Sequence, residues 1–162
     1  MQDNFGNRII EVYDASYDNY VKDIAMNLRI EDFDEVYAAT GGNPFDAVLE
    51  DWMTSIRKWI IFNKQNIAVA VLGVRPLTMF SDIGIPWLLG ADGLNKMKMF
   101  FIKNSKTIIE EMKKNFRILI NCVDSRYVKA IRWLEWCGFT IDDAVPIGAD
   151  KVPFHMIYME CN

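Results

Sequence analysis

Two glycines that follow a short apolar run are the residues in this sequence with the clearest chemical use. The run is IPWLLG, residues 85–90, and the turn after it places Gly90 and Gly93 ahead of a predicted helix. Glycine lets backbone N–H groups approach a ligand closely, and the start of a helix attracts an anion such as a pyrophosphate. An ordinary turn before a helix explains this spacing at least as well. The candidate phosphate-binding loop consists of Leu89, Gly90, Ala91, Asp92 and Gly93.

Three acidic residues close together form a second chemical candidate. Asp46, Glu50 and Asp51 lie in one predicted helix, and paired carboxylates can share general acid–base work. They also lie near the N-terminus of that helix, where the helix dipole favours negative charge. The dipole and a solvated helix face account for all three, so we assign them no catalytic role.

The cysteines and the single histidine give little reason to expect a metal site. Cys122, Cys137 and Cys161 have the spacing of neither a zinc site nor a disulfide framework. His155 is the one histidine that could bind a metal, and it lies in an apolar predicted strand. We therefore expect reduced thiols, no metal, and a partly buried histidine held by a hydrogen bond.

Hydrophobic periodicity defines the elements that must position these residues. Apolar residues at helical spacing indicate helices, and short β-branched or aromatic runs between turns indicate strands. The predicted helices cover 17–28, 33–40, 44–56, 98–115 and 125–137. The predicted strands cover 9–15, 59–62, 67–76, 85–90, 117–123, 140–147 and 153–161.

Capping residues mark several helix ends. Ser16 is the expected N-cap of the first helix, and Asn43 with Pro44 is the expected start of the third. Gly41 ends the second helix, and Gly138 can take the left-handed conformation that commonly ends a helix.

The composition indicates a single folded domain over residues 1–162. The chain is 51% hydrophobic and 25% charged, so it can bury a core without a metal or disulfide staple. A net charge of -4 argues against nucleic-acid binding. The longest apolar stretch, 67–74, is too short to cross a bilayer, and the polar N-terminus does not resemble a signal peptide. We expect a cytoplasmic protein with neither nucleic-acid nor membrane partners.

The order of the predicted elements sets the fold class. Helices alternate with strands after an initial group of helices and a hairpin, which predicts an α/β (α+β) domain with a central mixed twisted sheet flanked by helices. The strand–helix–strand segments at 85–123 and 117–145 are expected to be right-handed crossovers.

Residues 128–139, VKAIRWLEWCGF, carry a resemblance to a known family. Ala130, Gly138 and Phe139 match the pattern N-x-x-A-x-x-x-Y-x-x-x-G-F. With the element order from Ile9 to Cys161, the chain resembles the GNAT superfamily of N-acetyltransferases. The resemblance implies a GNAT-like fold, and it implies acetyl-CoA as the cofactor if the chain is active.

The chemical positions of the family pattern differ in this sequence. Tyr127 stands where the pattern has Asn, and Leu134 stands where it has the Tyr that protonates the leaving thiolate. The family's Q/R-x-x-G-x-G/A loop is reduced to Gly90 and Gly93. The resemblance therefore implies a degenerate acyl-CoA site, and in an active protein Tyr127 or Tyr158 would be the proton donor.

Two stretches are similar to one group within that superfamily. IPWLLG at 85–90, and IRWL at 131–134 with Gly138 and Phe139, resemble acetyltransferase-like proteins of short-tailed bacteriophages, some of which are described as internal virion proteins. This resemblance implies a location in the host cytoplasm or the virion. It also implies a protein partner from the virion or the host.

Three functions remain open at this stage. The preferred one is a non-catalytic binding or virion-assembly component that requires no cofactor. The alternative is an acetyl-CoA-dependent N-acetyltransferase with an atypical active site. The third is an inhibitor of a host protein, which the acidic charge allows but no residue specifies. We also predict that bulky residues from Met97 to Phe101 partly fill the cleft beside residues 85–90.

Overall fold

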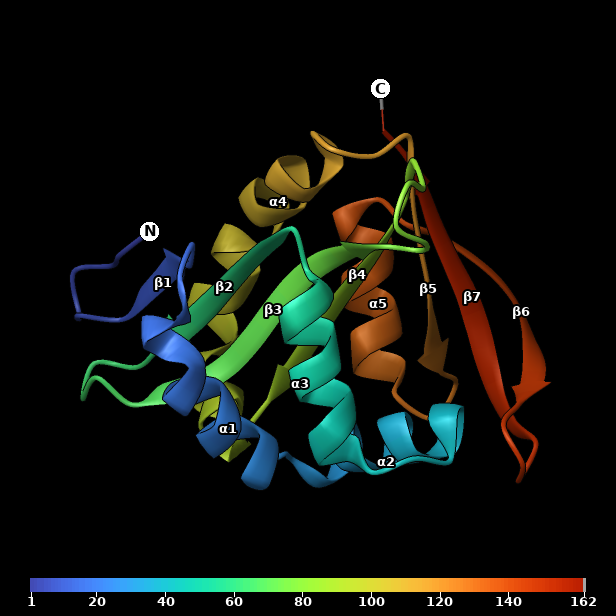
Figure 1. The fold of residues 1–162 in the computed structure, drawn as a ribbon, viewed down its shortest axis with the longest axis horizontal. Helices are drawn as coiled ribbons and strands as arrows, with labels where there is room; N and C mark the ends of the chain where they lie inside the picture. The colour runs from blue at the N-terminus through green and yellow to red at the C-terminus, as the bar shows by residue number, and fades with distance from the viewer. Residues whose placement is uncertain (162) are drawn as a thin grey trace.

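The computed structural model describes residues 1–161 as one mixed sheet with helices on both faces (Figure 1). The strands are β1 (Arg8–Glu11), β2 (Arg57–Phe62), β3 (Ala68–Pro76), β4 (Ile83–Gly90), β5 (Ile118–Asp124), β6 (Thr140–Ile147) and β7 (Val152–Glu160). The α-helices are α1 (Asp18–Met26), α2 (Ile30–Thr40), α3 (Pro44–Thr54), α4 (Lys98–Lys113) and α5 (Val128–Cys137). Short 3₁₀ helices, η1 (Ala15–Tyr17) and η2 (Asp92–Met97), precede α1 and α4. The predicted α/β (α+β) class is confirmed.

The separation of β4 from β5 is the feature of the sheet that creates a site. The strand order is β1-β2-β3-β4-β5-β7-β6, and β4 and β5 are its parallel neighbours. Within the described residues they pair at Ile83–Ile118 and Gly84–Leu119, and then diverge. Figure 1 shows the opening widening toward the bottom of the view. Beyond these pairs, one edge of each strand has no neighbouring strand.

Two hydrophobic cores hold the layers together. On one face, α1 and α3 pack on β2 and β3 through residues such as Ile24, Trp52 and Ile60. On the other face, α4 and α5 pack on the sheet through residues such as Ile108 and Leu134. Burying each such side chain contributes about 1.5–3 kcal/mol, so the two layers fix β4 and β5 from both sides.

The helix ends follow most of the predicted caps. The Asn43 side chain accepts a hydrogen bond from the Phe45 N–H at 3.0 Å, and Gly41 and Gly138 end α2 and α5 with φ of 67° and 105°. Ser16 is not the N-cap of α1: the Asp14 carboxylate instead accepts from the Ser16 N–H and begins η1. None of the helices in residues 1–161 is long and apolar enough to span a membrane.

One strand is shorter than predicted, and the sequence analysis did not predict the order of the last strands. β1 ends at Glu11 rather than at residue 15, because the chain turns into η1 after the Val12 N–H bonds to the Lys58 carbonyl. β7 lies between β5 and β6, so the strand after α5 does not pair directly with β5. The last two strands instead form an antiparallel hairpin that meets β5 through its second strand.

Candidate functional site

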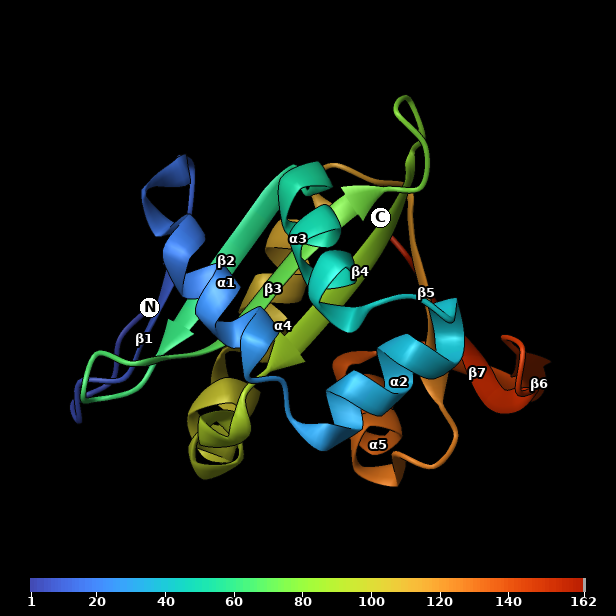
Figure 2. The same ribbon diagram turned by 60° about the horizontal axis from the view of Figure 1, so that its bottom comes forward.

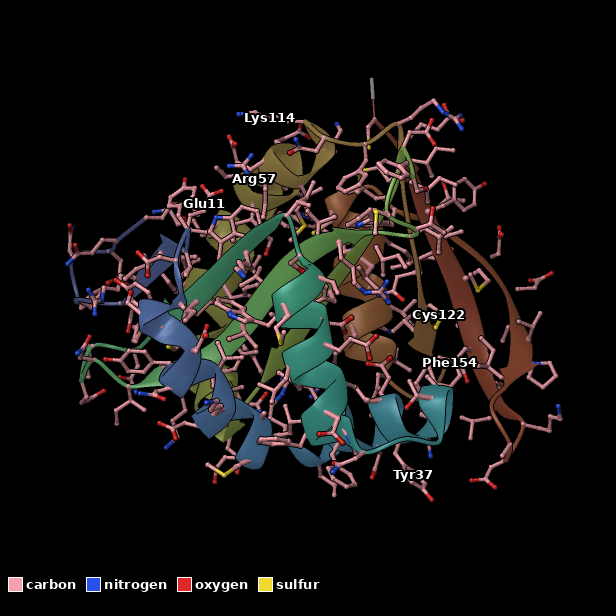
Figure 3. The ribbon with its side chains drawn as sticks, viewed as in Figure 1. Glu11, Tyr37, Arg57, Lys114, Cys122 and Phe154 are labelled. Carbon is pink, nitrogen blue, oxygen red and sulfur yellow. The ribbon has the colours of Figure 1, made fainter. Side chains whose placement is uncertain are left out.

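A cavity of about 450 Å³ lies at the opening between β4 and β5 and passes from one face of the sheet to the other. On the α4 and α5 side its walls are mostly apolar. On the α2 and α3 side the walls are polar and charged. Figure 2 shows α2 lying across the wide end of the opening between β4 and β5. In Figure 3, Cys122 and Phe154 mark β5 and β7 on the far side of the opening. The apolar wall includes Phe101, Ile108, Ile109, Met112, Trp133 and Leu134.

Asn121 joins the two separating strands with its side chain. Its Nδ2 donates a hydrogen bond to the Pro86 carbonyl at 2.7 Å, and its Oδ1 accepts from the Cys122 N–H at 2.8 Å. Pro86 has no N–H to offer a neighbouring strand. The Asn121 amide therefore replaces the missing strand pairing and fixes the width of the opening at this level.

The segment that leads into α2 occupies the next part of the β4 edge. The Gly90 N–H donates to Asp32 Oδ2 at 2.6 Å, and the Gly90 carbonyl accepts from the Arg29 N–H at 2.8 Å. Leu28 also forms a bridge with Ala91. The connection between α1 and α2 thus acts as a short added strand, and a ligand cannot use the backbone of Gly90 while it is in place.

The Asp32 carboxylate is buried, with 6% of the residue exposed, and needs its partners. Burial raises its pKa, while the Arg29 guanidinium and the Gly90 N–H act in the opposite direction. Arg29 binds both carboxylate oxygens of Asp32, at 2.7 and 2.8 Å. A buried charge held by a bidentate guanidinium and a backbone donor is ordered rather than free to react.

Glu35 is the carboxyl group in the cavity wall that is suited to proton transfer. Burial raises its pKa from 4.5 to about 7, and the charges of Asp32 and Asp124 act in the same direction. One hydrogen bond opposes this shift: the Asp124 N–H donates to Glu35 Oε1 at 2.7 Å. A general base works best when its pKa lies near the operating pH.

The wall on the α2 and α3 side is called here the polar mouth of the cavity. The remaining charged residues around it are largely paired. Arg29 binds Asp32, and Arg75 binds Asp51 at 2.6 Å. Glu35 and Glu50 also line the mouth, and within residues 1–161 neither forms an ion pair. The polar mouth of the cavity therefore carries the unpaired negative charge of Glu50, and that of Glu35 once its carboxyl has lost its proton.

The structure separates the five residues of the candidate phosphate loop. Leu89 lines the cavity, whereas Gly90 is covered by the Arg29–Asp32 segment. The Ala91 N–H bonds to the Val69 carbonyl, and Asp92 begins η2. Gly93 lines a different cavity, described below. Neither of these two cavities contains all five residues, so their role in binding stays a prediction.

Neither of the two candidate proton donors is among the described residues that line the cavity. Tyr127 is half-buried at the start of α5, and burial raises its pKa to about 12. Tyr158 is in β7 next to Ile157, which does line the cavity. Tyr158 shares a strand face with Phe154, which also lines the cavity, but it lies farther along β7 and is not part of the wall. Their catalytic role stays a prediction.

The structure also places the other residues that the sequence analysis names. Leu134 is buried and lines the apolar wall. Cys122 also lines the cavity, but burial raises the pKa of its thiol to about 11, so it is protonated at neutral pH and a poor nucleophile. His155 is half-buried with Nδ1 2.7 Å from the Asp142 carbonyl, as predicted. Phe101 lines the cavity, whereas Met97 is buried in the core and lines the second cavity.

The sequence contained signals for the residues that were missed. Asn121 is the polar residue inside the apolar run RILINCV, where a buried amide requires hydrogen-bond partners. Asp32 and Glu35 lie three apart, so they share one face of α2. That face could not be recognised because the helix was predicted to begin at residue 33 and to bury its aromatic residues.

Comparisons with known proteins define the fold. Neither a family model nor a curated protein matches the sequence. Spermidine N-acetyltransferase from Vibrio cholerae, in complex with CoA and spermine, matches with a TM-score of 0.63 at 13% identity, over 98% of this chain and 97% of that one. A protein assigned as a phosphinothricin N-acetyltransferase matches with a TM-score of 0.65 at 8% identity, over 96% and 99%. The protein smu.2055 from Streptococcus mutans UA159 matches with a TM-score of 0.67 at 14% identity, over 96% and 99%.

The protein therefore has the GNAT N-acetyltransferase fold over nearly its whole length. Identities of 8–14% establish the fold alone. The similarity to bacteriophage proteins stays a prediction, since these solved structures do not bear on it.

Proposed function

We propose that the protein is an acyl-CoA-dependent N-acyltransferase in which Glu35 is the general base. The observation that carries the proposal is a carboxyl group with a pKa of about 7 in the wall of the cavity between β4 and β5. The spermidine N-acetyltransferase of the same fold, solved with CoA and spermine, supports a CoA compound and an amine as the two ligands.

The cavity fits the thioester end of such a ligand. Its volume of about 450 Å³ lies within the usual range of small-molecule sites, roughly 300–1,000 Å³. The Pro86 carbonyl accepts a hydrogen bond from Asn121, and the backbone groups of Gly90 are bonded to Asp32 and Arg29. Leu88 lies between them, and the period of two puts its N–H and C=O on the same edge. In our proposal these two groups bind the thioester arm.

The chemistry follows from the position of Glu35. An amine nitrogen of the acceptor, in its neutral form, attacks the thioester carbonyl and gives a proton to the Glu35 carboxylate, so that a C–N bond forms and the C–S bond breaks. The protonated carboxyl then returns the proton to the leaving thiolate. A carboxyl group with a pKa of about 7 can perform both transfers near neutral pH. This route does not require Tyr127 or Tyr158.

The charge of the polar mouth indicates the acceptor. Arg29 and Arg75 neutralise Asp32 and Asp51, which leaves the charge of Glu50, and that of Glu35 in its deprotonated form, within the described residues. An excess of negative charge raises the local concentration of cations. We therefore propose as the acceptor a polyamine, whose reacting nitrogen is neutral and whose other nitrogens carry positive charge.

Two measurements test this proposal. Calorimetric titration with acetyl-CoA should give a saturable signal, and mass spectrometry should detect the acetylated product of a primary amine such as spermidine. Glu35→Gln should lower the turnover rate by roughly 100-fold or more, because general base catalysis typically contributes about 10²–10⁴. Glu31→Gln, an exposed carboxylate on the same helix, is the matched control. Binding without any turnover of several amines would contradict the proposal.

A second candidate is a non-catalytic binding domain, in a phage particle or elsewhere. The occupation of Gly90 by Asp32 and Arg29 favours it, because those backbone groups are then closed to a ligand. The absence of a tyrosine at Leu134 acts in the same direction. No heat on titration of millimolar acetyl-CoA would favour this candidate over acyl transfer, and mass spectrometry of purified phage particles would test the virion role.

A further inference from the structure

We propose that a second cavity in this protein binds a phosphate-bearing nucleotide. This cavity, called here the N-terminal cavity, has a volume of about 670 Å³ and lies away from the opening between β4 and β5. Three segments line it: the loop before β1, the turn between β2 and β3, and η2. The first two lie side by side at the left of Figure 1. The residues that carry the argument are Phe5, Asn63, Lys64, Gln65, Gly93 and Lys96.

The β2–β3 turn is held in one conformation. The Asn63 Oδ1 accepts hydrogen bonds from the backbone N–H groups of Gln65 and Ile67, each at 3.0 Å. Asn66 takes a left-handed φ of 62°, which asparagine tolerates better than most residues. Lys64 is therefore placed by an ordered turn. Because the Asn63 oxygen is used, its amide N–H groups are the ones that can face a ligand.

Close packing of η2 brings a second lysine to the same cavity. A Cβ at Gly93 would lie 2.6 Å from Val69 Cγ1, so glycine allows η2 to approach β3. Lys96 follows one turn later and also lines the cavity. Lys64 and Lys96 thus reach one space from elements more than twenty residues apart in the chain.

The charge of the N-terminal cavity is opposite to that of the whole protein. Its lining contains two lysines and no acidic residue, although the chain has a net charge of -4. Within residues 1–161 neither lysine forms an ion pair. The nearby Asp3 carboxylate is occupied by hydrogen bonds from Phe5 and Asn7. Paired lysines with amide donors are well suited to phosphate oxygens.

Phe5 supplies a flat apolar surface beside these lysines. The residue is 79% exposed, and its ring packs on no core cluster of the described chain. The loop that carries it is held by the Asp3 hydrogen bonds, and it turns at Gly6, which takes a left-handed φ of 91°. Nucleobases stack on such exposed aromatic rings, with a gain of about 1–3 kcal/mol per base. A base on Phe5 and phosphates on Lys64 and Lys96 together define a nucleotide.

Two different ligands could supply this nucleotide group. Leu89 lines the cavity between the strands and Gly93 lines the N-terminal cavity, so one short segment contacts both spaces. The nucleotide is accordingly either the phosphorylated adenosine end of an acyl-CoA or a separate free nucleotide. The site itself does not depend on acyl transfer.

Calorimetric titration of the full chain with adenosine 3′,5′-bisphosphate tests the proposal. Wild type should bind the probe, and the double variant Lys64→Gln, Lys96→Gln should bind at least about tenfold more weakly, which corresponds to about 1.4 kcal/mol. The control Lys103→Gln, Lys129→Gln removes the same charge from exposed sites on α4 and α5 and should bind as wild type does. Phe5→Ala should weaken binding without lowering the thermal midpoint.

The outcomes separate this site from the proposed acyl transfer. Displacement of the probe by CoA identifies the adenosine end of an acyl-CoA, and simultaneous binding of both identifies a separate nucleotide. Probe binding by a protein without transferase activity would leave the nucleotide site standing. No binding of the probe at millimolar concentration, or equal affinity of the Lys64, Lys96 variant and its control, would overturn it.

Discussion

The Asn121 side chain donates a hydrogen bond to the Pro86 carbonyl at 2.7 Å across two strands that have stopped pairing. This single amide spans the opening that defines the candidate site. The same side chain is fixed from behind by the Cys122 N–H. At this level the two strands are thus joined by a side-chain hydrogen bond rather than by a strand ladder.

Replacing Asn121 should change both stability and the cavity. Asn121→Leu leaves the Pro86 carbonyl without its donor, so we expect a loss of about 1–3 kcal/mol in the free energy of unfolding, measured with urea. Asn121→Asp should be worse, since a carboxylate would face the carbonyl oxygen. Asn115→Leu, in an exposed turn, is the control. Equal stability of Asn121→Leu and wild type would show that the bridge has no structural role.

Asp32 should contribute strongly to the position of α2. Asp32→Ala leaves the Gly90 N–H unpaired and the Arg29 guanidinium without its carboxylate, so we expect destabilisation of about 3–5 kcal/mol. Asp34→Ala, an exposed acid on the same helix, should change stability by less than about 0.5 kcal/mol. Guanidinium unfolding of both variants makes the comparison, and similar midpoints would argue against the role given to Asp32.

Gly93 should tolerate no side chain. Gly93→Ala places a methyl group 2.6 Å from Val69 Cγ1, and relieving that contact should cost about 1–3 kcal/mol. Gly42→Ala is a suitable control, because its Cβ would meet its nearest neighbour, Thr40 Oγ1, at 3.5 Å. A thermal midpoint of Gly93→Ala equal to that of the control would mean that η2 can shift without cost.

Glu35 should make stability depend on pH. Its pKa rises from 4.5 in the unfolded chain to about 7 in the folded one, so between these values the folded state binds the extra proton. The contribution of Glu35 is therefore most favourable at low pH and is lost as pH rises toward 7, by up to about 3 kcal/mol. Glu35→Gln should lack this dependence. Parallel stability–pH curves for the two proteins would contradict the shift.

In helix α2, sequence periodicity predicted the helix but not the face that it buries. The stripe Phe33, Val36, Tyr37 indicated a helix correctly, and Gly41 ended it as predicted. The stripe did not indicate the buried face: Phe33 is 45% and Tyr37 is 52% exposed, while Asp32 is buried. Figure 3 shows Tyr37 on the outer side of α2. A carboxylate with a guanidinium and a backbone donor can be buried where periodicity alone would place an aromatic ring.

The site was less predictable than the fold for a physical reason. The caps at Asn43 and Gly138 act locally, within a few residues of the chain. The site instead depends on long-range pairs such as Gly90 with Asp32 and Asp124 with Glu35. Each partner is an unremarkable residue in its own segment. In the loop from Leu89 to Gly93, Gly90 is covered by the α1–α2 connection, which no local pattern indicates.

The rate of acyl transfer measured against pH tests the central claim most directly. Using acetyl-CoA and spermidine, kcat/KM of the wild type should rise with pH and level off above a midpoint near 7, as Glu35 loses its proton. Glu35→Gln should be slower by roughly 100-fold or more and should lack this midpoint, while its acetyl-CoA affinity is unchanged. A Glu35→Gln variant with the wild-type rate and midpoint would contradict the assignment of Glu35 as the base.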